Sequence, residues 1–88
     1  MSYEWDEAKR LQNLEKHGVD FADAVGALED ERALSREDKR ATGEERFVVV
    51  GMDYLGRILT VVYTFRGEDL RLISARRATA AEGDAYGQ

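Results

Sequence analysis

The sequence predicts an α+β domain with two N-terminal helices, a small and mainly antiparallel β-sheet, and a C-terminal helix. Three observations support this class. Apolar residues recur at helical spacing over residues 8–28, they alternate with period two from residue 47 onward, and residues 79–82 form a capping-box sequence. The chain has 88 residues with no cysteine and no proline, which fits one small domain, 1–88, without disulfides.

The first helix is expected between two end signals. Asp6 is a favourable N-cap, and Gly18 stands just after His17, where a left-handed residue commonly ends a helix. Residues 3–5, before this helix, are typical of a short strand or a lead-in. Apolar residues at intervals of three mark one helical face: Ala8, Leu11 and Leu14.

The second helix is expected to start after Asp20, and Gly26 should weaken it by about 1 kcal/mol relative to alanine. Four apolar residues should form its buried side: Phe21, Ala24, Val25 and Leu28. The next stretch, 29–46, is highly charged. We expect it to hold a short edge strand around Arg32–Arg36 and an exposed turn after that strand.

A three-stranded antiparallel meander should follow. Its strands are expected at 47–52, 57–65 and 70–76, separated by turns at 53–56 and 66–69. Strict alternation in the last strand would place Arg71 and Arg76 on opposite faces of the sheet. The last helix is expected to begin after Thr79, with Gly83 weakening it and Tyr86 on its last turn.

Composition excludes several classes of protein. No cysteine is present to attack a substrate or to bind a metal, and His17 is the only histidine, so a structural zinc site is not expected. No apolar run reaches the length of a membrane helix, and the N-terminus lacks the features of a signal peptide. We therefore expect a soluble, cytoplasmic protein without a membrane partner.

The net charge of −5 is unevenly distributed along the chain. Residues 1–31 carry nine anions and three cations, and this negative excess argues against general affinity for nucleic acid. It suits a basic protein partner, or solubility alone. From residue 47 onward all five cations are arginines, whose planar fork fits phosphate or carboxylate.

A polar stripe on the first helix is the first candidate site. Lys9, Asn13 and His17 are spaced four residues apart, so they point the same way, and Lys16 lies beside them. The alternative interpretation is a solvated helix face with a cation at the C-terminal end of the helix dipole.

The arginines around the last two strands are the second candidate site: Arg66, Arg71, Arg76 and Arg77. Inside an apolar strand such side chains are costly unless they are paired or lie at an edge. Ion pairs to Asp or Glu are the alternative for each of them. Glu82 is more typical of a helix cap than of a catalytic base, and Tyr86 of a packed aromatic residue with a hydrated hydroxyl.

Short motifs run in a fixed order through nearly the whole chain. They are EWDEAK at 4–9, Asn13, KHGV at 16–19, Phe21, Ala24, GEER at 43–46, Gly51, LTVVYTFR at 59–66, RLISARRA at 71–78, Glu82 and Tyr86. In this order and spacing they resemble the BrnT-type toxins of bacterial type II toxin–antitoxin modules. A single KHG or SAR would carry little weight, whereas the joint pattern over some eighty residues is specific.

This resemblance implies a RelE-like fold, with the helices packed on one side of the sheet. It also implies a toxin that inhibits translation by cutting RNA, with or without the ribosome. The implied partner is a BrnA-like antitoxin with a ribbon–helix–helix DNA-binding part. The toxin would reach operator DNA only through this antitoxin, and the complex would repress its own operon.

The chemistry of such a ribonuclease needs no metal or other cofactor, because RNA carries its own nucleophile. The 2′-hydroxyl attacks the neighbouring phosphorus, and the products are a 2′,3′-cyclic phosphate and a free 5′-hydroxyl. His17 is then the natural acid–base candidate, Lys9 a phosphate ligand or base, and Arg66 and Arg76 the transition-state clamps. The expected RNA-binding residues are Asn13, Lys16, Arg71 and Arg77. Glu82 and Tyr86 are second-tier candidates.

Two alternatives to an active endoribonuclease toxin stay open. One is a catalytically inactive toxin homologue that binds the antitoxin and tunes operator occupancy. The other is a small interaction domain unrelated to RNA, for which Arg66, Arg71 and Arg76 should all be used in internal ion pairs and the helical stripe should face bulk solvent. An active site instead requires these groups to converge on one open concavity.

Overall fold

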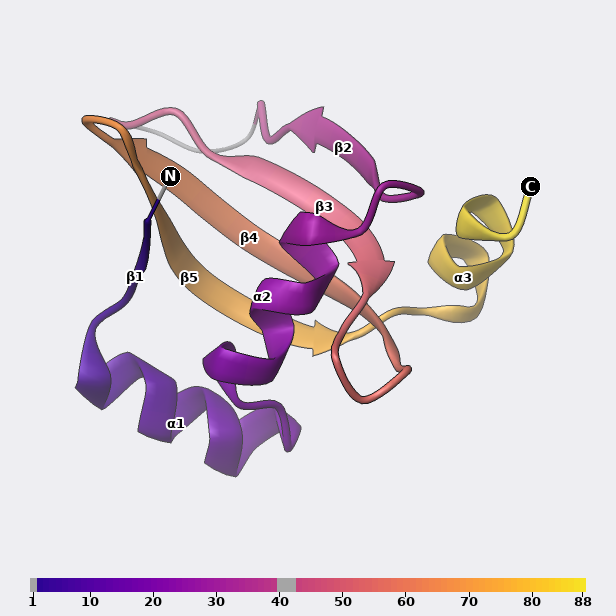
Figure 1. Cartoon of the computed structure of the whole chain (residues 1–88), viewed down its shortest axis with the longest axis horizontal. Helices are drawn as coiled ribbons and strands as arrows, with labels where there is room; N and C mark the ends of the chain where they lie inside the picture. The colour runs from indigo at the N-terminus through magenta and orange to yellow at the C-terminus, as the bar shows by residue number, and fades with distance from the viewer. Residues whose placement is uncertain (1, 40–42) are drawn as a thin grey trace.

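Three helices and a five-stranded mixed sheet make up the computed structural model, which describes residues 2–39 and 43–88 (Figure 1). The α+β class and the expected order of elements are confirmed. The elements in chain order are β1 (Tyr3–Glu4), α1 (Glu7–His17), α2 (Phe21–Glu29), β2 (Leu34–Glu37), β3 (Phe47–Met52), β4 (Ile58–Arg66), β5 (Asp69–Arg77) and α3 (Ala80–Tyr86).

The strands lie in the order β1-β5-β4-β3-β2. Strands β2 to β5 are antiparallel to their neighbours, while β1 pairs in parallel with the start of β5, with Tyr3 opposite Leu70. The predicted edge strand is therefore present as β2, and all four of its residues are exposed. The turn expected after it falls partly on residues 40–42, outside the described residues.

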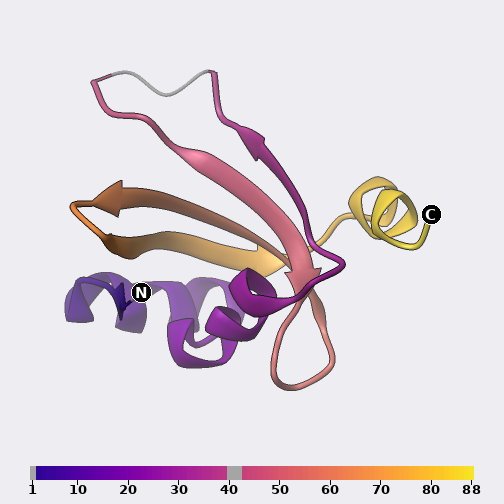
Figure 2. The same cartoon turned by 45° about the horizontal axis from the view of Figure 1, so that its top comes forward.

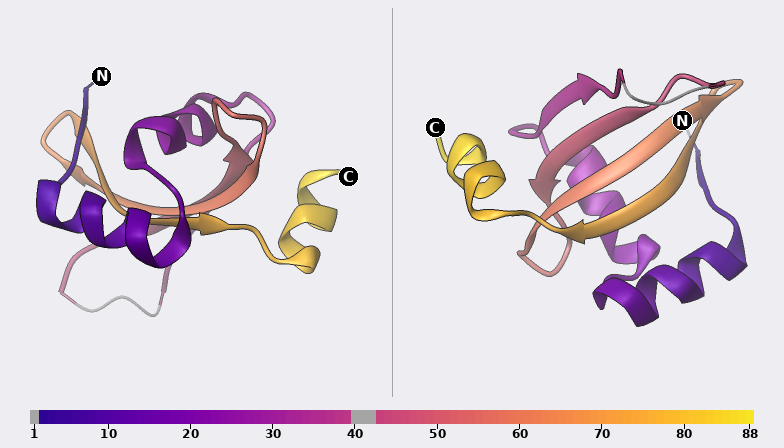
Figure 3. Two further views of the ribbon diagram at one scale, coloured as in Figure 1. Left: turned by 90° about the horizontal axis from the view of Figure 1, so that it is seen from below. Right: turned by 180° about the vertical axis from the view of Figure 1, so that it is seen from behind.

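Helices α1 and α2 pack on one side of the sheet (Figure 2). Helix α2 buries Phe21, Ala24 and Val25 as predicted. These side chains meet the sheet residues of the core, which are Val49, Leu59, Val61, Leu72 and Ala75. Helix α3 lies apart from the other two helices at the end of β5 (Figure 3). It approaches Val48 and Val50, which alternate with Val49 and so point to the other face, here called the open face. The expectation that all helices share one side is correct for α1 and α2 only.

The helix ends follow the predicted signals. The Asp6 side chain accepts hydrogen bonds from the backbone N–H groups of Ala8 and Lys9, and Gly18 ends α1 with a φ of 69°. Thr79 and Glu82 form the reciprocal bonds of a capping box at the start of α3. Local sequence chemistry therefore sets the boundaries of α1 and α3.

The predicted apolar face of α1 does not face the core. Leu11 and Leu14 are 52% and 39% exposed, and the one buried residue of the helix is Asn13, which is 7% exposed. The reason lies in the position of α1 beside β5, where the strand offers unpaired backbone polar groups. An amide side chain satisfies those groups and a leucine cannot.

The prediction that Arg71 and Arg76 face opposite sides of the sheet is wrong. Val62 pairs with Ser74, but Tyr63 pairs with Leu72, so Ile73 is an extra residue that forms a β-bulge in β5. Beyond the bulge the alternation is inverted. Arg71 and Arg76 lie opposite Thr64 and Thr60, both on the open face of the sheet.

Candidate functional site

A shallow cavity of about 250 Å³ lies between α1 and β5. The polar stripe of α1 forms one wall, and the bulge of β5 forms the other. Its lining residues are Lys9, Gln12, Asn13, Lys16, His17, Ile73 and Ser74. None of these lining residues, all from the described part of the chain, is an Asp or a Glu, although acidic residues outnumber basic ones in the protein as a whole.

Asn13 fixes α1 against the sheet. Its Nδ2 donates to the carbonyl oxygen of Ala75 at 2.7 Å, and the Ala75 N–H donates back to Oδ1 at 3.0 Å. The same Nδ2 donates to the carbonyl oxygen of Val19 at 3.0 Å, which fixes the connection between α1 and α2. RNA binding by Asn13 stays a prediction, and the structure shows that its amide holds the wall of the cavity in place.

Lys9 and His17 lie one helical turn before and after Asn13 on the same face of α1. His17 is half-buried in the last turn of the helix, whereas Lys9 and Lys16 are exposed. An imidazole can take or give a proton at neutral pH, and ammonium groups beside it can bind a phosphate. This arrangement can therefore support acid–base chemistry on a phosphodiester.

Arg76 is held by Glu82 rather than pointing free into the α1 cavity. Its Nη1 and Nη2 donate to Oε1 and Oε2 of Glu82 at 2.8 and 3.1 Å. The bond from Arg76 and a backbone N–H bond from Thr79 lower the pKa of Glu82 from 4.5 to about 2, against the effect of burial. The paired carboxylate is therefore ionised at neutral pH.

Arg66 and Arg71 share Glu4 as a partner at the far end of β5. The distances to Glu4 Oε1 are 3.9 Å for Arg66 Nε and 3.4 Å for Arg71 Nη1, and the Arg66 side chain is 62% exposed. Arg77 is exposed and lies opposite Leu59, on the face of α1 and α2. Arg66 and Arg77 are therefore accessible, whereas the Arg71 side chain is only 27% exposed.

Tyr86 anchors α3 instead of lining the α1 cavity. Its hydroxyl donates to Asp30 Oδ2 at 2.5 Å, and the same oxygen accepts the N–H of Met52 at 2.8 Å. Together with the pair between Arg76 and Glu82, this bond holds α3 beside the sheet. The hydroxyl that was expected to be hydrated therefore has an internal partner in Asp30.

The predicted catalytic residues therefore separate into three places. The structure brings Lys9 and His17 together, but it places Arg76 with Glu82 and Arg66 near Glu4. The expectation of a single concavity for all of them is not met. Ile73 and Ser74 were missed as lining residues, because alternation along β5 gives no sign of the bulge that brings them to the cavity.

The described residues form neither a metal site nor a membrane-spanning helix. No group of three or more His, Cys, Asp or Glu side chains stands close enough to hold a metal ion. None of the three helices has the length and apolar character needed to cross a membrane, as far as the described residues show.

Comparison with known proteins identifies similar chains. A family model described as the ribonuclease toxin BrnT of type II toxin–antitoxin systems matches residues 5–82. The chain is also similar to the crystal structure of the Brucella abortus ribonuclease toxin BrnT. That match has a TM-score of 0.65 and 30% sequence identity, and it covers 90% of this chain and 99% of the other. No curated relative matches the sequence.

Proposed function

Since the chain belongs to the BrnT family of ribonuclease toxins of type II toxin–antitoxin systems, we propose that it is an endoribonuclease that cuts RNA without a metal ion and thereby inhibits translation. Membership in such a system implies an antitoxin partner. The proposal concerns the reaction, the residues that perform it and the nature of the partner.

The observation that carries the proposal is the cavity between α1 and β5. In a protein with a net charge of −5, it gathers Lys9, Lys16 and His17 on one wall without a carboxylate among its described lining residues. A polyanion binds where positive charge is concentrated, whatever the total charge. The cavity therefore supplies the local attraction that the whole chain lacks.

The proposed reaction uses the substrate's own 2′-hydroxyl as the nucleophile. His17 either accepts the proton of this hydroxyl as the new oxygen–phosphorus bond forms, or donates a proton to the 5′-oxygen as its bond to phosphorus breaks, and water accepts or supplies the other proton. Lys9 and Lys16 stabilise the extra negative charge on the phosphorane. The products are a 2′,3′-cyclic phosphate and a 5′-hydroxyl, and atoms and charge balance without a cofactor.

The arginines extend this site over β5. Ser74 lines the cavity and Arg76 follows two residues later, roughly 7 Å along the strand. We assign Arg76 to the phosphate next to the cleaved bond, and Arg66 and Arg71 to the RNA backbone further along the open face. Arg77 lies on the other face of the sheet, so among these arginines it contributes least to this RNA path.

We further propose that the antitoxin is BrnA-like, with a ribbon–helix–helix part, and that the toxin reaches operator DNA only through it. The fold is proposed to belong to the RelE-like superfamily, and the site of action to be the cytoplasm, on free or ribosome-bound messenger RNA. The family assignment supports these proposals.

The test is cleavage of a structured messenger RNA by purified protein in excess EDTA, with the product ends typed chemically. His17→Ala and Lys9→Ala should lower the rate by about 10²-fold or more. Lys39→Ala replaces an exposed lysine outside the cavity and serves as the matched control. Loss of wild-type cleavage in EDTA would refute metal independence, and a His17→Ala rate equal to wild type would refute the assigned site.

A second candidate is an inactive homologue that only binds the antitoxin. It is favoured by the bidentate pair between Arg76 and Glu82 and by the contact between Arg71 and Glu4, because paired arginines can be purely structural. It predicts a tight complex with the antitoxin and no cleavage, with or without ribosomes. An interaction domain unrelated to RNA would have Arg66, Arg71 and Arg76 in internal ion pairs, as the structure shows. It is contradicted by the family, and the α1 stripe lines a cavity instead of facing bulk solvent.

A further inference from the structure

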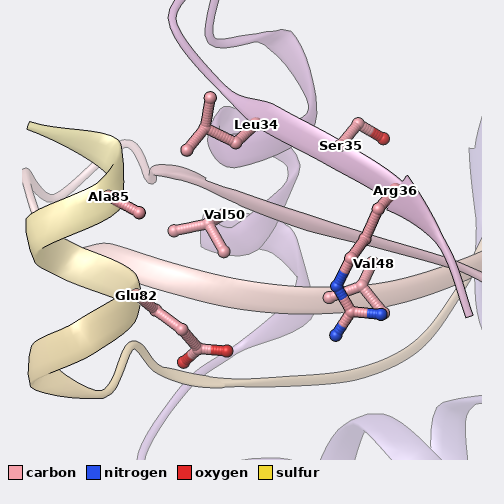
Figure 4. Close-up of a pocket in the computed structure, with 7 residues that line it drawn as sticks. All are labelled: Leu34, Ser35, Arg36, Val48, Val50, Glu82 and Ala85. Atoms are coloured by element: carbon pink, nitrogen blue, oxygen red, sulfur yellow. The ribbon is translucent and has the colours of Figure 1, made fainter. Parts of the chain in front are cut away.

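A second hollow lies on the open face, between β2, β3 and α3. It has a volume of about 290 Å³. Its walls are apolar and come from three elements: Leu34, Val48, Val50 and Ala85. We call it the β2–α3 groove. Figure 4 shows Arg36 beside Val48 on one side of this groove and Glu82 on the other side, with Val50 near Leu34 and Ala85.

The groove has donors on one side and an acceptor on the other. In the described part of the chain, the guanidinium of Arg36 has no ion-pair or hydrogen-bond partner, so its donors are available. Glu82 Oε1 accepts from Arg76 and from the Thr79 N–H, Oε2 accepts from Arg76, and the Thr60 side chain also interacts with this carboxylate. A carboxylate offers about four acceptor positions. Arg76, Thr79 and Thr60 use these positions, so a base in the groove would share a carboxylate oxygen with one of them, and the Glu82 side chain is 22% exposed.

An apolar groove that has charged groups on two sides can accept a nucleobase. Proteins that read RNA sequence bind single unstacked bases, which pack against side chains and use their edges for hydrogen bonds. Apolar walls and a few placed polar groups are also the usual composition of small-ligand sites. We propose that the β2–α3 groove binds one base of the RNA substrate and that guanine is the preferred base, an inference that rests on the proposed ribonuclease function.

The preference for guanine follows from the donors of Arg36 and the acceptors of Glu82 on two sides of the groove. An arginine fork bonds two neighbouring acceptors, and guanine presents O6 and N7 to it, whereas adenine has a donor in place of O6. The exocyclic N2 amino group of guanine points away from O6 and N7, and it can then share a carboxylate oxygen of Glu82. Cytosine also carries a donor beside two acceptors, but its single ring is shorter, and the two charged groups stand on two sides of the groove.

The groove is connected to the proposed site of cleavage through Arg76. This residue binds Glu82 at one side of the groove and belongs to the strand whose Ser74 lines the α1 cavity. A base held in the groove would therefore fix which phosphate reaches the cavity, so that base recognition and cleavage position are coupled.

The experiment is a titration of the full chain with the 3′-monophosphates of guanosine, adenosine, cytidine and uridine, followed by methyl NMR of Val48 and Val50. The expected result is that the guanosine nucleotide shifts these methyl signals and binds at least about fivefold more tightly than the others. Arg36→Gln should remove this preference. Arg32→Gln, a neighbouring arginine that does not line the groove, is the control for charge.

Three results would overturn the assignment. They are equal binding of the four nucleotides, shifts confined to residues outside the groove, and an Arg36→Gln variant that is folded by its amide spectrum and still prefers guanosine. Groove signals that respond to the antitoxin but to no nucleotide would equally refute it. The titration measures binding without catalysis, so the two proposals can fail separately. Cleavage in EDTA without a preference for guanosine would refute the groove assignment alone. Binding in the groove without cleavage would refute the ribonuclease proposal.

Discussion

The side-chain amide of Asn13 pairs with the backbone of Ala75 as a neighbouring strand would. Both the N–H and the carbonyl oxygen of Ala75 bond to this one amide, at 3.0 and 2.7 Å. Strand β1 covers only the first part of β5, opposite Leu70 and Arg71, so the rest of that edge needs another partner. Asn13 supplies it and also orients the face of α1 that carries Lys9 and His17. One residue thus closes the sheet edge and positions the candidate site.

Replacing Asn13 should therefore destabilise the whole domain. Asn13→Leu leaves the N–H and the carbonyl of Ala75 without partners in a buried place and removes the bond to Val19. We expect a loss of roughly 2–4 kcal/mol in the free energy of unfolding, measured by urea denaturation. Gln12→Leu, at the exposed position just before Asn13, is the control. A change below about 0.5 kcal/mol for Asn13→Leu would contradict this role.

Two glycines in helices should respond to alanine in opposite ways. A Cβ at Gly26 would stand 2.6 Å from the backbone nitrogen of Tyr54, whereas a Cβ at Gly83 would meet nothing within 4 Å. Gly26→Ala should therefore destabilise the domain by about 1–3 kcal/mol despite the better helix propensity of alanine. Gly83→Ala should stabilise α3 by up to about 1 kcal/mol.

Urea denaturation measures the effect at Gly26, and amide hydrogen exchange in α3 measures the effect at Gly83. The two substitutions are the same chemical change in the same type of element, so each is the other's control. Equal stabilisation by both would show that the close approach between α2 and the turn after β3 is not rigid.

Local signals in the sequence predicted most of the fold. The caps at Asp6, Asp20 and Thr79 mark where the helices begin. Turn glycines such as Gly56, which has a φ of 82°, mark the turns between the strands of the meander. Two errors came from applying a period too strictly. The apolar spacing of α1 did not reveal that the buried position is polar, and the alternation in β5 did not reveal the bulge at Ile73. Both depend on contacts between residues far apart in sequence.

The candidate site was predictable only in part for the same reason. Spacing of four residues placed Lys9, Asn13 and His17 on one face, and the structure keeps them together. The partners of Arg76 and Arg71 depend on where α3 and β1 return to the sheet, which no local pattern encodes. The position of Arg36 on the open face depends on the register of β2 against β3, in which Arg36 lies opposite Val48.

Acid should release α3 before it unfolds the domain. The bond from Arg76, with smaller contributions from Thr79 and Thr60, outweighs burial and lowers the pKa of Glu82 from 4.5 to about 2 in the folded state. The stabilisation from this pair is therefore complete above pH about 4.5 and is lost as the pH falls toward 2. Arg76 is 41% exposed, so we expect roughly 1 kcal/mol from the pair.

The measurement is the Cα chemical shifts of residues 80–86 between pH 6 and 2. Glu82→Gln should abolish the part of the pH-dependent change in these shifts that comes from the ion pair between Arg76 and Glu82. A second acid group also holds α3, because burial raises the pKa of Asp30 but the hydrogen bonds from Tyr86 and from backbone N–H groups outweigh it and lower that pKa. Tyr86→Phe separates this contribution. An unchanged pH profile in Glu82→Gln would mean that Glu82 does not fasten the helix.

Variants of the ion pair between Arg76 and Glu82 can show whether Arg76 binds RNA or only stabilises the fold. If Arg76 clamps a phosphate, Arg76→Ala should abolish growth arrest on expression without unfolding the domain, and Glu82→Gln should retain toxicity, because it frees the guanidinium from its internal anion. If Arg76 serves only to hold Glu82, both single variants should weaken α3 equally and the double variant should be no worse than either. Growth curves at matched expression, with thermal denaturation of each purified variant, distinguish the two. Toxicity of Arg76→Ala equal to that of the wild type would exclude Arg76 from the catalytic residues.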